Sequence, residues 1–443
     1  MLTLGSLFDG SGGFPLAASL CGIEPVWAAE VEPYPIAVTK SRFPNMIHLG
    51  DVCEINGAEI PPVDIISFGS PCQDMSVAGT RSGLKHEDNG DDETTRSGLF
   101  FEAIRIIKEM REATHGKYPT YAILENVPGM FSSHKGEDFR IILEEFVKII
   151  EPSATMPPID KNGWAYADAY VGNGWSLAYR TFDAQYWGTA QRRRRCFLAF
   201  CIGSERAPEI LFKRKGLRGN YSQSRQTWKG TTFTTENSSG AADCEVNAIC
   251  YGISPYASNA MLSSNPHSGI YVADTSRTLD LNGGNPACHQ GGIAVVEPTV
   301  YALDRAFFNQ GQNAAYEPQC YDDGTTSTLV AKGPSAVCHP IDVQQYIVRR
   351  LTPTECARLQ GFPDFWGHPD QKTELSDEEY EFWLNTRNTH AAINGKAVKT
   401  YTKDQMLKWY NKLHTDSAEY KMWGNGIALP NALYVMEGIA ECE

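Results

Sequence analysis

The first 200 residues alternate short apolar runs with amphipathic segments, and this alternation constrains the fold more than any other feature of the sequence. Six runs have the length and apolar content of buried strands: 2–8, 25–30, 64–69, 120–125, 175–180 and 196–200. Three segments place apolar residues at the spacing of one helix face: 14–20, 98–112 and 137–150. This order predicts an α/β, Rossmann-like domain with a mostly parallel sheet.

Residues 201–345 have a different texture, because Gly, Asn, Ser, Thr and Pro become frequent and helical periodicity fades. We predict a smaller, loop- and strand-rich second domain there. The stretch 274–290 aligns without gaps to 324–340, and Tyr251 and Tyr301 keep the same offset. We interpret 251–290 and 301–340 as two copies of one supersecondary unit.

The helical pattern returns after 345. Residues 346–420 hold the block RRLTPTE and a charged, amphipathic insertion, expected to be helical. Residues 421–443 begin with a glycine turn that opens a helix, and we expect them to complete the domain formed by 1–200.

Composition and charge narrow the class of protein. The net charge of −14 argues against a nucleic-acid partner, since phosphate contacts need Lys and Arg. Basic residues are clustered, however, at 192–195, 206–230 and 349–350, so a locally basic face remains open. The chain shows no signal peptide, no apolar run of membrane length and twelve cysteines, which we interpret as free thiols. We therefore expect a cytoplasmic protein without a membrane partner.

The loop FDGSGGF (8–14) lies between a predicted strand and a predicted helix, where glycines let backbone N–H groups approach a ligand. Glu30 ends the second strand 20 residues after Gly10, where α/β nucleotide sites place the acceptor for a ribose hydroxyl. Asp51 follows the next short run and could bind an adenine amino group. Taken singly, each feature also fits an ordinary turn or a surface carboxylate.

Cys72 lies in the turn GSPCQ, directly behind an apolar strand. A thiolate at a strand end is a candidate nucleophile, although most cysteines are packed core thiols. Glu125 also closes a predicted strand, so it should face the same crevice and could serve as a general acid. The stretch QRRRR (191–195) offers planar donors for a base carbonyl or phosphates, or is a solvated basic turn.

Together these pieces resemble the DNA (cytosine-5) methyltransferase family of bacterial and phage restriction-modification type. The blocks are SLFDGSGGF, GSPCQ, ENV, QRRRR, RRLTPTECARLQGFP and GNGI, in the family's order over nearly the whole chain. The resemblance implies S-adenosylmethionine as cofactor, S-adenosylhomocysteine as product, no metal, double-stranded DNA as substrate and a target-recognition domain at 201–345. It also implies a monomer and leaves room for a cognate restriction endonuclease.

The resemblance also assigns chemistry to residues. Cys72 would add to C6 of a flipped-out cytosine, while Glu125 hydrogen-bonds N3 and the exocyclic amine. Arg193 and Arg195 would hold the flipped nucleotide. The implied cofactor-binding residues are Phe8, Gly10, Gly12, Gly13, Phe14, Glu30, Val31, Asp51, Val52, Pro71 and Asn425. The implied substrate-binding residues are Gln73, Ser76, Asn126, Gln191, Thr278 and Thr328.

Two of the blocks depart from the family pattern. The first block usually begins D-L-F-A-G. Here Ser6 stands where the family has aspartate, and the carboxylate is found three residues later, at Asp9. The last block is usually G-N-S-V or G-N-A-V, and Gly426 removes that side chain. Neither change touches the reacting groups, so we expect an active enzyme.

The recognition region carries two Thr-Leu pairs, beginning at Thr278 and Thr328, one per repeat. Each repeat could supply a recognition element, or the repeat could be a duplicated scaffold. Cys288-His289 and Cys338-His339 lack the spacing of zinc ligands. Three rivals stay open: an RNA methyltransferase, a DNA-binding regulator without turnover and a thiol-dependent hydroxymethylase of free nucleotides.

Overall fold

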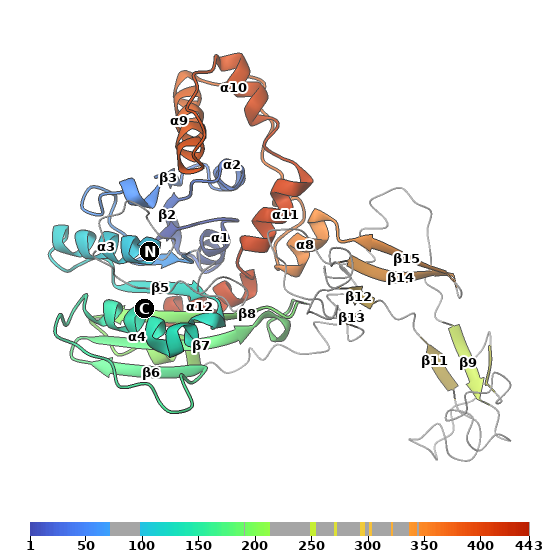
Figure 1. Cartoon of the computed structure of the whole chain (residues 1–443), viewed down its shortest axis with the longest axis horizontal. Coiled ribbons are helices and arrows are strands. Elements are labelled where there is room, and N and C mark those ends of the chain that lie inside the picture. Colours follow the sequence, from blue (N-terminus) through green and yellow to red (C-terminus); the bar gives the residue numbers. More distant parts are fainter. Residues whose placement is uncertain are drawn as a thin grey trace.

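A computed structural model describes residues 1–70, 98–189, 191–212, 249–253, 270–272, 293–296, 301–303, 320–321, 336–342 and 345–442. Its centre is an eight-stranded sheet in the order β3-β2-β1-β4-β5-β8-β7-β6 (Figure 1). The strands are β1 (Thr3–Leu7), β2 (Glu24–Ala29), β3 (Ile47–His48), β4 (Ile65–Phe68), β5 (Tyr121–Asn126), β6 (Ala167–Gly172), β7 (Trp175–Asp183) and β8 (Arg194–Ile202).

The first five strands pair in parallel, and β8, β7 and β6 follow in antiparallel pairs. The order reverses between β1 and β4, which makes their boundary a topological switch point where α/β sheets bind ligands. The predicted Rossmann-like α/β fold is confirmed, and all six predicted strands are present.

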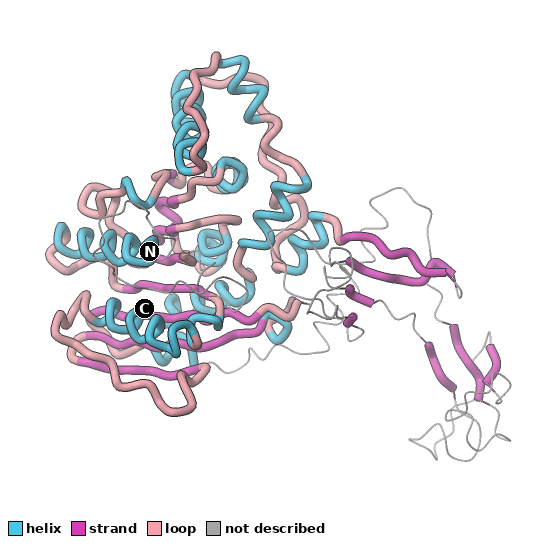
Figure 2. The backbone as a smooth tube through the Cα atoms, viewed as in Figure 1, coloured by secondary structure: helices cyan, strands magenta, loops and turns pink. Residues whose placement is uncertain are grey.

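Helices cover both faces of the sheet (Figure 2). Ile65 and Ile123 face one hydrophobic core, which α1 (Gly13–Leu20), α5 (Ala207–Phe212) and α12 (Leu429–Cys442) complete. Their neighbours Ile66 and Leu124 face the other core, which α3 (Gly98–Ala113) and α4 (Glu137–Val147) complete. Burial on both faces explains why these strands are apolar throughout rather than alternating with polar residues.

The structure adds elements that the sequence patterns did not predict. α2 (Pro33–Arg42) begins with proline, whose fixed φ suits the first helical turn, yet it carries no apolar stripe because it is buried along most of its length. The hairpin of β6 with β7 forms the sheet's outer edge. The short 3₁₀ helices are η1 (Val52–Glu54), η2 (Pro128–Phe131), η3 (Ser133–Gly136) and η4 (Ala184–Tyr186).

The insertion is helical, as expected. After α8 (Pro353–Leu359), α9 (Asp377–Ile393) and α10 (Lys403–Tyr410) project beyond the β3 edge, and α11 (Asp416–Asn425) leads back to the sheet (Figure 1). Capping boxes start α8, α9 and α10. Trp383 and Met406 pack against Ile36 and Ala37 of α2, so α9 and α10, which we call the arm, rest on the helix that follows β2.

Small sheets occupy the region predicted to be strand-rich. β9 (Ile249–Ile253), β10 (Ile270–Val272) and β11 (Ile293–Val296) form one sheet; β12 (Tyr301–Leu303), β13 (Cys320–Tyr321), β14 (Ala336–Asp342) and β15 (Gln345–Arg350) form another. The rest of the predicted repeat lies outside the described residues. In the described part of the chain, no helix combines the length and apolarity that a membrane crossing requires.

Leu143 of α4 is fully buried in the second core, whereas Leu20 at the end of α1 is 61% exposed. Leu143→Ala should lower the free energy of unfolding by about 3–5 kcal/mol, because it leaves a cavity beneath the sheet. The matched control Leu20→Ala should change it by less than about 0.5 kcal/mol. Urea unfolding followed by circular dichroism measures both; equal midpoints for the two variants would contradict this packing.

Candidate active site

The carboxyl ends of β1, β2, β4 and β5 meet at one edge of the sheet, because these strands are parallel. Phe8, Glu30, Gly69 and Glu125 lie at those ends. β8 runs the opposite way, so its first residues reach the same edge: Cys196 pairs with Asn126. The ends of five strands thus bring these residues to one edge of the sheet.

The turn after β1 needs backbone conformations that favour glycine. Phe8, Gly10 and Gly12 have φ values of 56°, 55° and 76°. A Cβ on Gly12 would lie 2.8 Å from Thr39 Cγ2, and one on Gly13 would lie 2.0 Å from Ile427 Cγ2. These two glycines therefore serve packing. A Cβ on Gly10 would meet little but open space, so its backbone is the accessible part of the loop. Phe14 is buried in the core beneath.

The Glu30 carboxylate holds this turn against the end of β2. Its Oε2 accepts a hydrogen bond from Gly10 N at 2.8 Å, and its Oε1 accepts from Val31 N and Glu32 N at 2.8 and 2.9 Å. Burial raises the pKa of Glu30, while these N–H donors oppose the shift. Glu30 therefore shapes the loop, and lone pairs remain on its oxygens for a ligand hydroxyl.

Ser6 and Asp9, the two exchanged positions, touch each other. Ser6 Oγ donates to Asp9 Oδ1 at 2.7 Å, so the displaced carboxylate lies beside the position that the family's usual aspartate occupies. Asp9 is 8% exposed, and its Oδ2 has no hydrogen-bond partner among the described residues. Burial and the nearby Glu30 charge raise the pKa of Asp9 to about 7, although the hydrogen bond from Ser6 opposes the shift.

Asp51 caps the short helix η1, because its Oδ1 accepts from Cys53 N at 3.0 Å. Asp51 itself is half-buried. Val52 is buried in the core. Its side chain therefore supports the Asp51 turn.

Glu125 pairs with Arg195: Arg195 Nε lies 3.0 Å from Glu125 Oε1, and both side chains are about 15% exposed (14% and 15%). Gly69 directly follows β4. A Cβ at this position would lie 3.1 Å from Glu125 Oε2. Glu125 therefore reaches across from β5 to the end of β4. Its neighbour Asn126 is buried and accepts a bond from Val127 N at 2.6 Å.

Arg193 is 1% exposed and donates to the backbone oxygens of Gly424 and Gly426. Its guanidinium therefore fastens the loop that presents the exposed Asn425. Gln191 is fully buried, and its amide has no hydrogen-bond partner among the residues that the structure describes. Two of the arginine-block residues thus point inward, while Arg195 faces Glu125.

Six sequence-predicted site residues lie outside the described residues: Pro71, Cys72, Gln73, Ser76, Thr278 and Thr328. The structure instead adds Trp366, which sequence reasoning missed. Its Nε1 donates to Ser11 O at 2.8 Å, and its ring lies beside Gly12. The sequence signal that could have identified Trp366 was its position three residues after the block RRLTPTECARLQGFP. Gly426 also has a packing reason, since a Cβ there would lie 2.8 Å from Ser11 Oγ.

A switched parallel sheet with a glycine turn, an acid after β2 and a carboxylate at the end of β5 defines the Rossmann-like methyltransferase class. The profile of C-5 cytosine-specific DNA methylases matches residues 2–149 and 168–381. The chain belongs to this family.

Individual relatives differ in what their names state. The "DNA N-6-adenine-methyltransferase" of Escherichia phage P1 is 28% identical over 99% of this chain, which covers 61% of that relative. The Type II methyltransferase M.Bsp6I of Bacillus sp. is 30% identical over 45% of this chain, covering 51% of its own length. A crystal structure of the S. pombe Dnmt2 methyltransferase aligns over 100% of the chain and 99% of its own, at 14% identity and a TM-score of 0.48.

The raised pKa of Asp9 makes stability depend on pH. The unfolded carboxyl ionises near its ordinary value, and the folded one only at about 7, so stability falls as pH rises between those values. From about pH 5 to about pH 8 the wild type should lose about 2–3 kcal/mol relative to Asp9→Asn.

Urea unfolding of both proteins at the two pH values measures this difference. Asp364→Asn is the control, because Arg358 lowers the pKa of Asp364 and that carboxyl is ionised in both states throughout the interval. A constant difference between wild type and Asp9→Asn would contradict a protonated, buried Asp9.

Proposed function

We propose that the protein methylates C5 of cytosine within a short sequence of duplex DNA, with S-adenosylmethionine as methyl donor. The observation that carries the proposal is the Glu125–Arg195 pair at the ends of β5 and β8, facing the end of β4. In the sequence, Cys72 follows Gly69 by three residues. We propose that a base bound at this edge meets the Glu125 carboxylate, the Arg195 guanidinium and the Cys72 thiol.

The residues at the β1 and β2 ends fit the cofactor. Gly10 exposes backbone at the turn, and Glu30 and Asp51 supply carboxylate oxygens for ribose hydroxyls and an adenine amine. The buried, unpartnered Oδ2 of Asp9 suits the cationic amine of the cofactor's methionine portion. We propose Phe8, Val31, Val52, Pro71 and Asn425 as further contacts.

The bound cofactor supplies an electrophilic methyl group. The chain's own residues prepare the base: the Cys72 thiolate forms a bond to C6 as the C5–C6 double bond opens, and Glu125 hydrogen-bonds the ring edge and supports protonation at N3. The ring thereby becomes nucleophilic at C5 and accepts the methyl group there. Loss of the C5 proton to water and breakage of the bond between C6 and Cys72 then restore the aromatic ring and free the thiolate. Arg195 holds the Glu125 carboxylate in place and contributes positive charge beside the flipped nucleotide, and Arg193 fixes the loop of Asn425.

Substrate recognition is proposed for residues 201–345, with Thr278 and Thr328 as candidate base-reading positions and Gln73, Ser76, Asn126 and Gln191 near the flipped nucleotide. Arg192, Arg194 and the basic stretch at 206–230 would contact phosphates. We propose that the protein acts as a monomer in the cytoplasm of a bacterium. It is encoded by the bacterium or by a phage, and a cognate restriction endonuclease can accompany it.

Methylation of the adenine amino group is a second candidate, favoured by the name of the phage P1 relative. That chemistry needs no addition to the base, because an exocyclic amine attacks the methyl group directly. A strand-end cysteine turn behind β4 and an ion-paired Glu125 favour cytosine C5 instead.

Transfer of labelled methyl groups to unmethylated duplex DNA, followed by mass spectrometry of the nucleosides, separates the candidates. We expect 5-methylcytosine, a loss of at least about 10⁴-fold in rate for Cys72→Ala and about 10²–10⁴-fold for Glu125→Gln. Cys53→Ala, a change at an exposed thiol, is the control. N6-methyladenine in the product, or full activity of Cys72→Ala, would refute the proposal; transfer to RNA alone would indicate the RNA-acting rival.

The arginine block offers a matched comparison. Arg195 pairs with Glu125, whereas its neighbour Arg194 is exposed and lies over the Tyr166 ring. Arg195→Lys should lower kcat by about 10-fold or more, because lysine lacks the planar donors that hold a carboxylate. Arg194→Lys should leave kcat near the wild-type value. Steady-state kinetics on cognate DNA tests this, and equal effects of the two substitutions would remove the special role of Arg195.

A further inference from the structure

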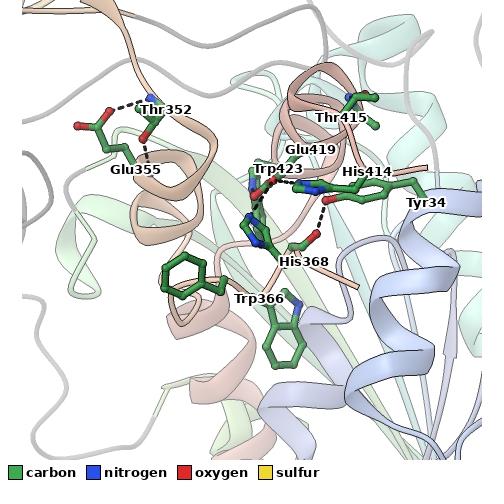
Figure 3. Close-up of polar contacts among 12 residues, drawn as sticks. Tyr34, Thr352, Glu355, Trp366, His368, His414, Thr415, Glu419 and Trp423 are labelled. Carbon is green, nitrogen blue, oxygen red and sulfur yellow. Dashed lines mark hydrogen bonds and ion pairs between the residues drawn. The ribbon is translucent and has the colours of Figure 1, made fainter. Parts of the chain in front are cut away.

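Two histidines and a glutamate meet at the base of the arm (Figure 3). His368 lies in the loop after α8, before the arm, and His414 and Glu419 lie after it, just before and within α11. One ligand atom from each residue lies within 4.8 Å of the other two. Glu419 Oε2 is 2.8 Å from His414 Nε2 and 3.8 Å from His368 Nε2.

The carboxylate is held for this arrangement rather than free to turn. Glu419 is 3% exposed, and Trp423 Nε1 donates to its Oε1 at 3.1 Å, which leaves Oε2 aimed at the histidines. A Cβ at Gly367 would lie 2.6 Å from Glu419 Oε1, so only glycine lets the loop of His368 approach. A hydrogen bond like that from Trp423, which orients a carboxylate from outside the ligand set, is typical of metal sites.

His414 is oriented as well. Its ring stacks on Tyr34 of α2 at 5.9 Å with an interplanar angle of 13°, and Tyr34 Oη donates to Gly367 O. Arg42 Nη2 donates to His368 O at 2.8 Å, which fixes the backbone of the third residue. His368 is 43% exposed, so solvent and ions can enter the cluster.

We propose that His368, His414 and Glu419 bind one divalent transition-metal ion, such as Zn²⁺. Imidazole nitrogens and a carboxylate oxygen form a ligand set for this ion, and a water molecule would take the fourth position. Ligand atoms around tetrahedral zinc lie about 3.3 Å apart, so shifts of about 1 Å close the observed arrangement.

The position of the ligands assigns the ion a structural role. His368 and His414 bracket residues 369–413, so one ion would fasten both ends of the arm. The loop of His368 also carries Trp366, which donates to Ser11 in the glycine turn. The ion would therefore stiffen the support of that turn without touching the proposed reacting groups.

Metal-stripped protein titrated with Co²⁺ and then Zn²⁺ tests the site independently of methyl transfer. We expect one equivalent to bind, with weak visible bands and without the intense near-ultraviolet band of cobalt thiolates, which excludes binding through cysteines. His368→Asn and His414→Asn should each weaken binding by at least about 10-fold. His115→Asn, a change at an exposed histidine elsewhere, should bind as the wild type does.

His368→Asn keeps the test decisive if the buried part of the cluster is needed for folding, because His368 is in an exposed loop. Circular dichroism checks that each variant is folded before titration. Zn²⁺ should also raise the thermal midpoint of the wild type and not that of His368→Asn. The proposal is overturned if the wild type binds no equivalent of metal, or if folded His368→Asn and His414→Asn bind as tightly as His115→Asn.

Discussion

Burial of the parallel sheet on both faces is the constraint on which the rest of the structure depends. Helices cover the two faces, so ligands reach the sheet at the edge where the parallel strands end. The polar groups at that edge then stabilise one another: Glu30 accepts the N–H group of Gly10, and Glu125 pairs with Arg195. The proposed cofactor site and the proposed base site lie on either side of the switch point between β1 and β4.

The second half of the chain returns to complete this edge. α12 packs on α1, and a buried Arg193 binds the carbonyl groups around Asn425, which places the C-terminal block beside the glycine turn. Trp366 approaches the same turn from another segment. The arm rests on α2. The Glu32 carboxylate lies within ion-pair distance of His390 in the arm and of Lys421 in α11. Residues distant in sequence thus stabilise one loop at the end of β1.

Sequence patterns predicted the six central strands and the helices with apolar stripes, because those patterns report burial directly. They missed α2, whose residues are buried along most of its length and therefore show no stripe. They located Glu125 and Arg195 but not their pairing, which depends on β8 running antiparallel to β5. They grouped Arg193 with Arg195, whereas the structure buries Arg193 against the backbone oxygens of Gly424 and Gly426 and pairs Arg195 with Glu125.

The sequence by itself determined the class of fold, the family and the types of residue available for chemistry, because motif order and apolar periodicity survive without coordinates. Only the tertiary structure decided which groups meet. It brought the Arg193 guanidinium to the backbone oxygen of Gly426. It joined His368 to Glu419 across an insertion. Such contacts depend on how distant segments pack, and no local pattern encodes that.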